Sequence, residues 1–364
     1  MGTLYGHLGL ADTDRVFGSN EYQQQFFDET RQILARYNLE MAGQMTSFVE
    51  GTVTVAQRRY RLPGGGMMQS RGGLSQSLAV KGRGYWDVAF PIHEIGDQIA
   101  GDRVAMAYMT VGEFDTHVVT VLKRHTARVR FDIMRRLFNN VAETFSDPHY
   151  GALTVQPLAN GDATTYPPVI GGEVEATANH YLASNFAASA ISDTNNPYKL
   201  IVAKLEPQFG YTQGGANIVT FIHPDQTALT QALTDFVDVP DSYITLGDNE
   251  RNVTGLPAMP GTARLIGRTN GTWVAEWLAS TPTGYMLSIH KDAPPPLLKR
   301  IDPPETGLGG GLQIVASNGA TGESYPFAQR HYEDRYGFGA GNRLSGVALQ
   351  LVASTTYVIP AVYA

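Results

Sequence analysis

The sequence predicts a mixed α+β fold in which one domain is interrupted by another. Three features of the 364 residues carry this prediction. A helical pattern begins at Thr110 and runs for about 34 residues, which at 1.5 Å per residue gives a rod of roughly 50 Å. Residues 151–299 alternate between short helical and strand patterns, whereas residues 308–364 carry strand signals throughout. Because a β tail follows the alternating insert, we expect the rod and the tail to form one discontinuous domain.

Composition is typical of a globular protein and excludes several classes. Hydrophobic residues make up 43% and charged residues 17% of the chain, so burial of apolar side chains can drive folding. The net charge of −7 excludes a uniformly basic nucleic-acid-binding protein but not local basic patches. With no cysteine, the chain has no disulfides, thiolate metal sites or cysteine nucleophiles. No signal peptide and no apolar run of about 18 residues is found, so we expect no membrane association.

The long helix has a defined start, a defined end and a basic surface. "TVGE", at Thr110 to Glu113, matches a capping box, and "SDP", at 146–148, contains a proline that stops a helix. We expect the helix to run from Thr110 to Glu143, with Val141 on its apolar stripe. Its basic residues are Lys123, Arg124, Arg128, Arg130, Arg135 and Arg136.

A second helix and a basic ribbon precede the rod. Residues 20–40 show helical periodicity, and since no nearby segment pairs with them, we expect this helix to pack on something distant or on another chain. "TVTVAQRRYRL" and "GYWDVAFPIHEIG" carry strand signals on either side of a glycine-rich stretch. From Gly51 to Trp86 there is no acid, and the basic residues are Arg58, Arg59, Arg61, Arg71, Lys81 and Arg83.

The ribbon has few large apolar residues, and a two-stranded ribbon is marginally stable alone in water. We therefore predict that other copies of the chain stabilise it, rather than its own body. Outside residues 51–86 the formal charge is −7 − 6 = −13, so a neighbouring copy offers acidic surface. For the rod, weak non-specific contact with DNA is left open.

The insert contains three segments that we expect to be helical: "GGEVEATANHYLASNFAASA", "NNPYKLIVAKLE" and "PDQTALTQALTDF". "ANIVTFIH" is expected to be a buried strand. "ARLIGRTNGTWVAEWLA" predicts a hairpin, because Asn270-Gly271 between two strand patterns favours a type I′ turn.

None of the familiar catalytic or cofactor motifs is met. The glycine loop lacks the lysine and the following helix of a phosphate-binding loop, and "YGFGAGN" departs from the dinucleotide fingerprint at Asn342. No two of the nine histidines have the spacing of a helical metal pair, and His125 is expected to be a satisfied core or interface residue. Acid pairs such as Glu333/Asp334 are read as solvated faces. We predict no catalytic residue, no metal and no cofactor.

The order of elements resembles the major capsid proteins of tailed bacteriophages, which have the Hong Kong 97 fold. The most specific segments are "GYWDVAFPIHEIGDQIA" leading to "MTVGEFDTH", and the tail "HYEDRYGFGAGNRLSGVALQLV" with "YVIP". The resemblance implies an N-terminal arm at 1–48 and an extended β-hairpin loop at 49–92. It further implies a peripheral domain at 93–150 and 300–364 with the rod as its spine helix, and an axial domain at 151–299.

The resemblance also implies a function and partners. The chain would assemble in the host cytoplasm into pentamers and hexamers of an icosahedral shell, the virion capsid, around double-stranded DNA held by non-specific contact. The six bases of the ribbon would contact neighbouring subunits, and those of the rod would face DNA or neighbours. Since Met1 lies shortly before the first helix, a separate scaffolding protein is expected, with a portal and a possible decoration protein.

Two alternatives stay open at this point. An encapsulin-type nanocompartment shares the fold and encloses protein cargo. A two-domain α/β enzyme with a glycine-rich loop would instead have a deep pocket near residues 63–73.

Overall fold

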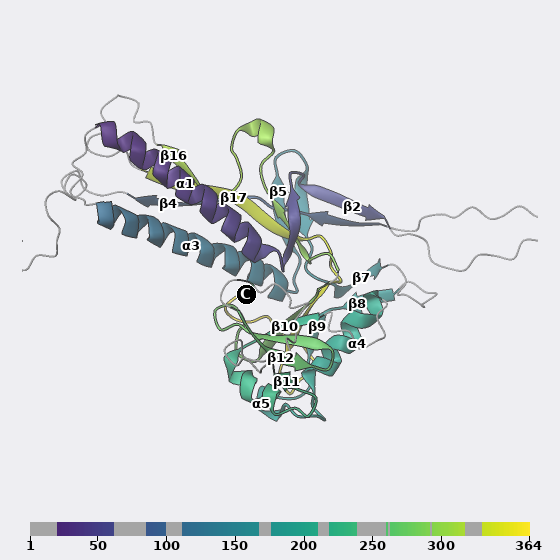
Figure 1. The fold of residues 1–364 in the computed structure, drawn as a ribbon. Coiled ribbons are helices and arrows are strands. Elements are labelled where there is room, and N and C mark those ends of the chain that lie inside the picture. The colour runs from purple at the N-terminus through teal and green to yellow at the C-terminus, as the bar shows by residue number, and fades with distance from the viewer. Residues whose placement is uncertain are drawn as a thin grey trace, which may run out of the picture. The chain divides into compact units, whose positions relative to one another are not determined.

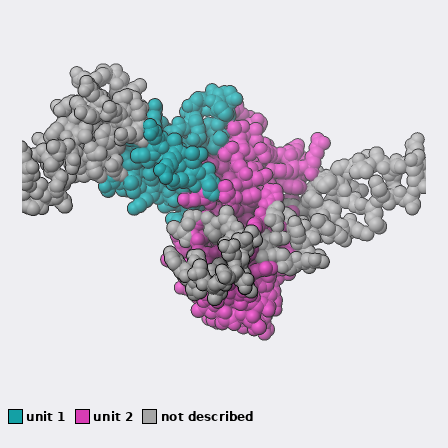
Figure 2. Space-filling model, viewed as in Figure 1, with its two compact units in different colours: residues 1–43, 92–130, 301–337 teal, residues 44–91, 131–300, 338–364 magenta. Residues whose placement is uncertain are grey.

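The computed structural model divides the chain into two compact units, and both are discontinuous in sequence. Figure 2 shows unit 1 in teal and unit 2 in magenta. Unit 1 comprises residues 1–43, 92–130 and 301–337, and unit 2 comprises residues 44–91, 131–300 and 338–364. The structure describes residues 20–61, 85–99, 111–166, 176–209, 218–238, 260, 263–291, 293–316 and 330–364. The predicted mixed α+β class is confirmed.

Unit 1 contains the greater part of two long helices and three antiparallel strands. The helices are α1 (Asn20–Met45) and α3 (Val111–Phe138), which lie side by side in Figure 1. The sheet has β17 (Arg330–Ala340) between β4 (His93–Ile99) and β16 (Gln313–Ala316). A short 3₁₀ turn, η5, spans Pro304–Thr306.

The core of unit 1 forms where α1 meets α3. Leu34 of α1 is buried with Val118 and Val121 of α3, together with Leu312 and Tyr332 from the tail. The Tyr37 hydroxyl also donates to the backbone oxygen of Leu122, 85 residues away. The expectation that the first helix packs on something distant is therefore confirmed, and its partner is the rod of its own chain.

The rod is shorter than the sequence predicts. α3 has 28 residues and ends at Phe138, not at Glu143, so its length is about 42 Å. The Asn139 side-chain oxygen accepts a hydrogen bond from the Val141 amide at 2.8 Å, and such local bonding competes with helix continuation. Val141, expected on the apolar stripe, is 56% exposed. Thr110 lies outside the described residues, so its expected cap is not described.

Unit 2 is built on a seven-stranded sheet with β10 near its centre. All five residues of β10 (Ile218–Ile222) are buried, which confirms the predicted buried strand. One face carries an apolar cluster in which Ile201 and Leu205 of α4 (Pro197–Phe209) pack on the sheet. The strand order is β11 (Val237–Asp238), β12 (Arg264–Thr269), β13 (Thr272–Glu276), β10, β14 (Tyr285–His290), β18 (Gly346–Gln350) and β9 (Tyr181–Ala183).

Local sequence signals hold for some parts of unit 2 and fail for others. Asn270 and Gly271 have φ values of 46° and 79°, which confirms the β12–β13 hairpin and its turn. The helix of residues 195–206 is confirmed by α4. The third predicted helix is reduced to the 3₁₀ turn η4 (Pro224–Gln226) and the single turn α5 (Thr227–Gln231).

The helix predicted at 171–190 is wrong for its described part. Residues 176–190 form β8 (Ala176–Asn179), β9 and the 3₁₀ turn η3 (Ala188–Ala190). The His180 amide donates to Ala159 O, and β9 runs parallel to β18. Long-range pairing with the sheet therefore overrides the local helical propensity.

Several smaller pairings complete unit 2. β1 (Val49–Val53) runs parallel to β15 (Leu297–Arg300). The single strand predicted across "TVTVAQRRYRL" is divided in the structure between β1 and a second strand, β2. The other pairs are β2 (Gln57–Arg61) with β3 (Tyr85–Ala89), β5 (Glu143–Asp147) with β6 (Gly151–Val155), and β7 (Asn160–Tyr166) with β8. None of the helices in the described ranges is long and apolar enough to cross a membrane.

Two glycines of the "YGFGAGN" segment allow close packing, Gly339 against residues 89–90 and Gly341 against Leu298. A Cβ on Gly339 would lie 2.6 Å from Phe90 Cδ1 and 2.7 Å from Ala89 O, and one on Gly341 would lie 2.6 Å from Leu298 Cδ1. Gly339 and Gly341, whose segment does not match the dinucleotide-binding motif, therefore serve close packing of the chain.

Gly339→Ala is expected to lower the free energy of unfolding by about 1–3 kcal/mol, because the added methyl overlaps a backbone oxygen and a buried ring. Gly51→Ala, in strand β1, is the matched control, since a Cβ there meets nothing within 4 Å. Urea unfolding of the unassembled subunits measures both. Equal effects of the two substitutions would refute the packing role.

His180 makes the stability of unit 2 depend on pH. Its side chain is fully buried, Nδ1 lies 2.8 Å from Gly346 O, and burial lowers its pKa from 6.5 to about 4. Above pH 6.5 the imidazole ring is neutral in both the folded and the unfolded chain. Below it the unfolded chain binds a proton that the folded chain does not take up until about pH 4, so stability falls across this window.

His180→Asn should flatten this part of the pH profile, because the amide can still donate to Gly346 O but does not titrate. The difference in the free energy of unfolding between wild type and variant should change by about 3 kcal/mol between pH 7 and pH 4. Unfolding free energies at several pH values test this, and parallel profiles for the two proteins would contradict it.

Candidate functional site

The β2–β3 hairpin is the described part of the basic ribbon, and its register defines two faces (Figure 1). Residues directly opposite each other in an antiparallel pair lie on the same face. Arg58 is opposite Val88 and Tyr60 is opposite Trp86, which gives one face. Arg59 opposite Asp87, and Arg61 opposite Tyr85, give the other.

The first face packs on the chain's own body. The Tyr60 and Trp86 rings stack at 5.3 Å with an angle of 17° between their planes. Both rings pack against a buried cluster that contains Val88, Phe90 and Leu298. The prediction that the ribbon is not stabilised by its own body is therefore wrong for residues 57–61 and 85–89. The sequence suggested otherwise because one member of this cluster, Leu298, lies more than 200 residues away in the chain.

Hydrogen bonds fix the base of the hairpin. The Phe90 amide donates to Ala56 O at 2.8 Å, which closes the two strands. Arg300 Nη1 donates to Phe90 O at 2.8 Å, and its Nη2 lies 3.4 Å from the Asp147 carboxylate. A charged side chain from β15 thus binds the residue that directly follows β3, and this holds the base of the hairpin.

The second face carries a compact charged and aromatic group. Arg59 donates two hydrogen bonds to the Asp87 carboxylate, at 2.7 and 2.8 Å. These bonds hold the pKa of Asp87 below its ordinary value. The Arg59 guanidinium also lies over the Tyr85 ring, 4.1 Å from its centroid. Asp87 was missed in the sequence because it lies one residue beyond the acid-free stretch, and only the hairpin register shows that it faces Arg59.

The other bases of the ribbon differ in their surroundings. Arg58 and Arg61 are exposed, and in the described part of the chain no acid pairs with either. Arg71, Lys81 and Arg83 lie outside the described residues, as does the glycine-rich stretch where the enzyme alternative expects a pocket.

Three of the six basic residues predicted on the rod form ion pairs within their own unit. Arg124 donates twice to Asp97 of β4, at 2.9 and 3.2 Å. Arg135 and Arg136 share the Glu143 carboxylate, at 2.7 and 3.0 Å. Arg136 is only 8% exposed, so its burial favours a structural role over contact with DNA.

The other three bases on the rod are more accessible. Lys123 and Arg128 are exposed, and Arg130 is half-buried. Lys123 and Arg128 are five residues apart on α3, which at about 100° per residue points them some 140° apart, so they do not form a continuous basic face.

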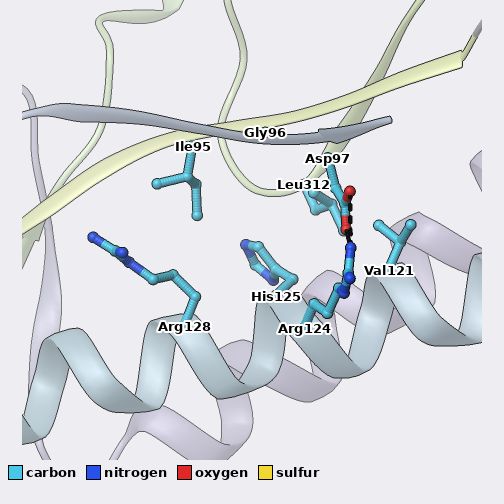
Figure 3. A pocket seen from close by; sticks show the side chains of 8 residues that line it. All are labelled: Ile95, Gly96, Asp97, Val121, Arg124, His125, Arg128 and Leu312. Atoms are coloured by element: carbon cyan, nitrogen blue, oxygen red, sulfur yellow. Dashed lines mark hydrogen bonds and ion pairs between the residues drawn. The ribbon is translucent and has the colours of Figure 1, made fainter. Parts of the chain in front are cut away.

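A cavity of about 380 Å³ lies between β4 and α3 (Figure 3). Its lining residues are Ile95, Gly96, Asp97, Val121, Arg124, His125, Arg128 and Leu312. No serine or threonine is among these lining residues. Within the described ranges, no three histidine, aspartate or glutamate side chains are placed to hold a metal ion.

His125 belongs to a buried network, as expected of a satisfied core residue. Its Nε2 lies 2.9 Å from the Asp334 carboxylate, and its Nδ1 lies 2.9 Å from the Tyr37 hydroxyl. Tyr37 is also 2.8 Å from the Thr126 hydroxyl. Asp334 is only 2% exposed, so the reading of the Glu333/Asp334 pair as a solvated face is wrong for Asp334. The network ties α1, α3 and β17 together.

The arginines of the tail motif have structural roles. Arg343 is 2% exposed, and its guanidinium donates to Pro157 O at 2.8 Å, Asn160 Oδ1 at 3.1 Å and Asp162 at 2.9 Å. Arg335, in unit 1, donates to Asp302 at 2.7 Å and Glu94 at 2.8 Å. The motif that carries the resemblance is therefore a set of charge-assisted hydrogen bonds inside each unit.

Comparisons with known proteins agree with this architecture. Neither a protein-family model nor a curated protein matches the sequence. A solved structure from Mycobacterium phage Patience matches with a TM-score of 0.67 and 20% identity, and covers 97% of this chain and 95% of that chain. The bacteriophage PhiM1 mature capsid matches with a TM-score of 0.47 and 10% identity, and covers 84% of this chain and 86% of that chain. The capsid of an empty GTA particle matches with a TM-score of 0.45 and 12% identity, and covers 85% of this chain and 90% of that chain. The chain thus has the fold of the Mycobacterium phage Patience structure, along nearly its whole length.

Proposed function

We propose that this chain is a non-catalytic major capsid protein of the tailed-bacteriophage type, which self-assembles into an icosahedral shell around double-stranded DNA. The observation that carries the proposal is the shared fold with a phage structure over 97% of this chain. The long helix α3 and the mixed α+β architecture support the proposal. The motif residues Arg335 and Arg343 form hydrogen bonds and ion pairs within their own units, which suits a structural protein.

The domain names of the resemblance form part of the proposal. Residues 1–48 are an N-terminal arm, 49–92 an extended loop, 93–150 and 300–364 a peripheral domain, and 151–299 an axial domain. α3 is then the spine helix, with Lys123 and Arg128 available for weak contact with packaged DNA. The loop that reaches a neighbouring copy carries six basic residues: Arg58, Arg59, Arg61, Arg71, Lys81 and Arg83.

The described hairpin has a fixed base. Arg300 binds Phe90 O, and the Tyr60–Trp86 stack packs against the buried cluster, so β2 and β3 hold a defined position on unit 2. A contact from the loop of one copy to the body of the next is heterologous, and such contacts close into rings when the rotation between copies permits. Other copies in pentamers and hexamers are therefore the main partner. A scaffolding protein, a portal and a decoration protein are further partners, and assembly takes place in the host cytoplasm.

Electron microscopy of the purified chain at high concentration tests the proposal. We expect closed shells, or rings of five or six copies, because the subunit carries its own lateral contacts. A chain that stays monomeric or forms only small twofold oligomers at every concentration and salt condition would contradict it.

The contents of particles from the native source separate the phage shell from a nanocompartment. Nuclease-resistant double-stranded DNA inside the particles supports the proposal. Particles filled with a protein cargo and free of DNA would support the encapsulin-type alternative instead.

A further inference from the structure

The outer face of the β2–β3 hairpin carries four side chains in one small area. They are Arg59 and Arg61 from β2, and Tyr85 and Asp87 from β3. The Tyr85 residue is 61% exposed and the Arg59 side chain 57% exposed. The opposite face packs on the body through Tyr60 and Trp86, so this is the face of the described hairpin that can meet another molecule.

The arrangement fixes the position of Tyr85 before any partner arrives. Asp87 receives two hydrogen bonds from the Arg59 guanidinium, which orients its plane. The oriented guanidinium then lies 4.1 Å from the centre of the Tyr85 ring. An aromatic side chain that is already ordered loses little conformational entropy on binding. The Arg59 charge is already compensated by Asp87, so Arg59 acts mainly by holding the ring.

The composition of this face favours a protein partner. Tyrosine and arginine are enriched at the residues that dominate binding energy in protein interfaces. With Asp87 opposing Arg59, the net charge of the four residues is +1, from two arginines and one acid. Nucleic-acid interfaces are much more positively charged. The chain outside residues 51–86 carries a formal charge of −13, so a second copy supplies the complementary surface.

We propose that Tyr85, held in place by Arg59 and Asp87, is the anchor with which the hairpin docks on a second copy of this chain. Arg61 pairs with a carboxylate of that copy. The proposal rests on the self-assembly proposed above and names the residues that carry it. Of the bases predicted to contact a neighbouring subunit, Arg61 keeps that role, whereas Arg59 acts by holding Tyr85.

Tyr85→Ala in the full chain tests the anchor. The concentration needed for half-maximal assembly should rise by about 30-fold or more, as expected when an interface anchor is truncated. Tyr85→Phe keeps the ring and should assemble at close to the wild-type concentration. Tyr150→Ala, at a 67% exposed tyrosine in the β5–β6 turn, is the matched control and should assemble like wild type. Thermal unfolding of the unassembled subunit should be the same for all, since the Tyr85 side chain lies outside the buried cores.

The outcomes separate this inference from the proposed function. A wild-type chain that never forms shells or rings overturns the proposed function. A wild-type chain that assembles, with Tyr85→Ala assembling at the same concentration, overturns the anchor alone. A Tyr85→Ala variant that assembles normally but loses binding of a double-stranded DNA fragment would show that this face contacts nucleic acid, and would also overturn the anchor.

Discussion

The packing of the inner hairpin face on the body is the interaction on which the proposed assembly depends. A ribbon of two strands gains little from its own hydrogen bonds, because water competes for them. Here the Tyr60–Trp86 stack and the fully buried Val88 add apolar burial against Leu298. Gly339 lets the tail approach the end of β3 closely enough to complete this packing. The hairpin therefore has a defined face toward its own body and a defined face toward solvent.

Charged side chains fix the elements around this packing. Arg300 binds Phe90, the residue that directly follows β3, and Arg343 binds three backbone or side-chain groups between residues 157 and 162. Both guanidiniums are largely removed from water, so each depends on its partners to offset the cost of desolvation. In unit 1 the buried His125–Asp334 contact has the same role between α3 and β17. Polar contacts of this kind specify one arrangement of elements, whereas apolar packing alone permits several.

The sequence predicted most of the secondary structure but few of the contacts that define the site. Helical periodicity identified α1, α3 and α4, and Asn270-Gly271 identified a hairpin, because these signals are local. The end of α3 was misplaced because the Asn139 side chain, not Pro148, stops the helix. β9, next to His180, was read as helix because its pairing partner, β18, lies more than 150 residues away. Asp87 was overlooked since its role depends on register alone.

Hydrogen exchange of the dilute, monomeric subunit tests the central claim most directly. If the hairpin root is held by its own body, the backbone amides of β2 and β3 will exchange about as slowly as those of β1 and β15, with no second copy present. Exchange of β2 and β3 at the rate of an unstructured peptide, while β1 and β15 stay protected, would contradict the account.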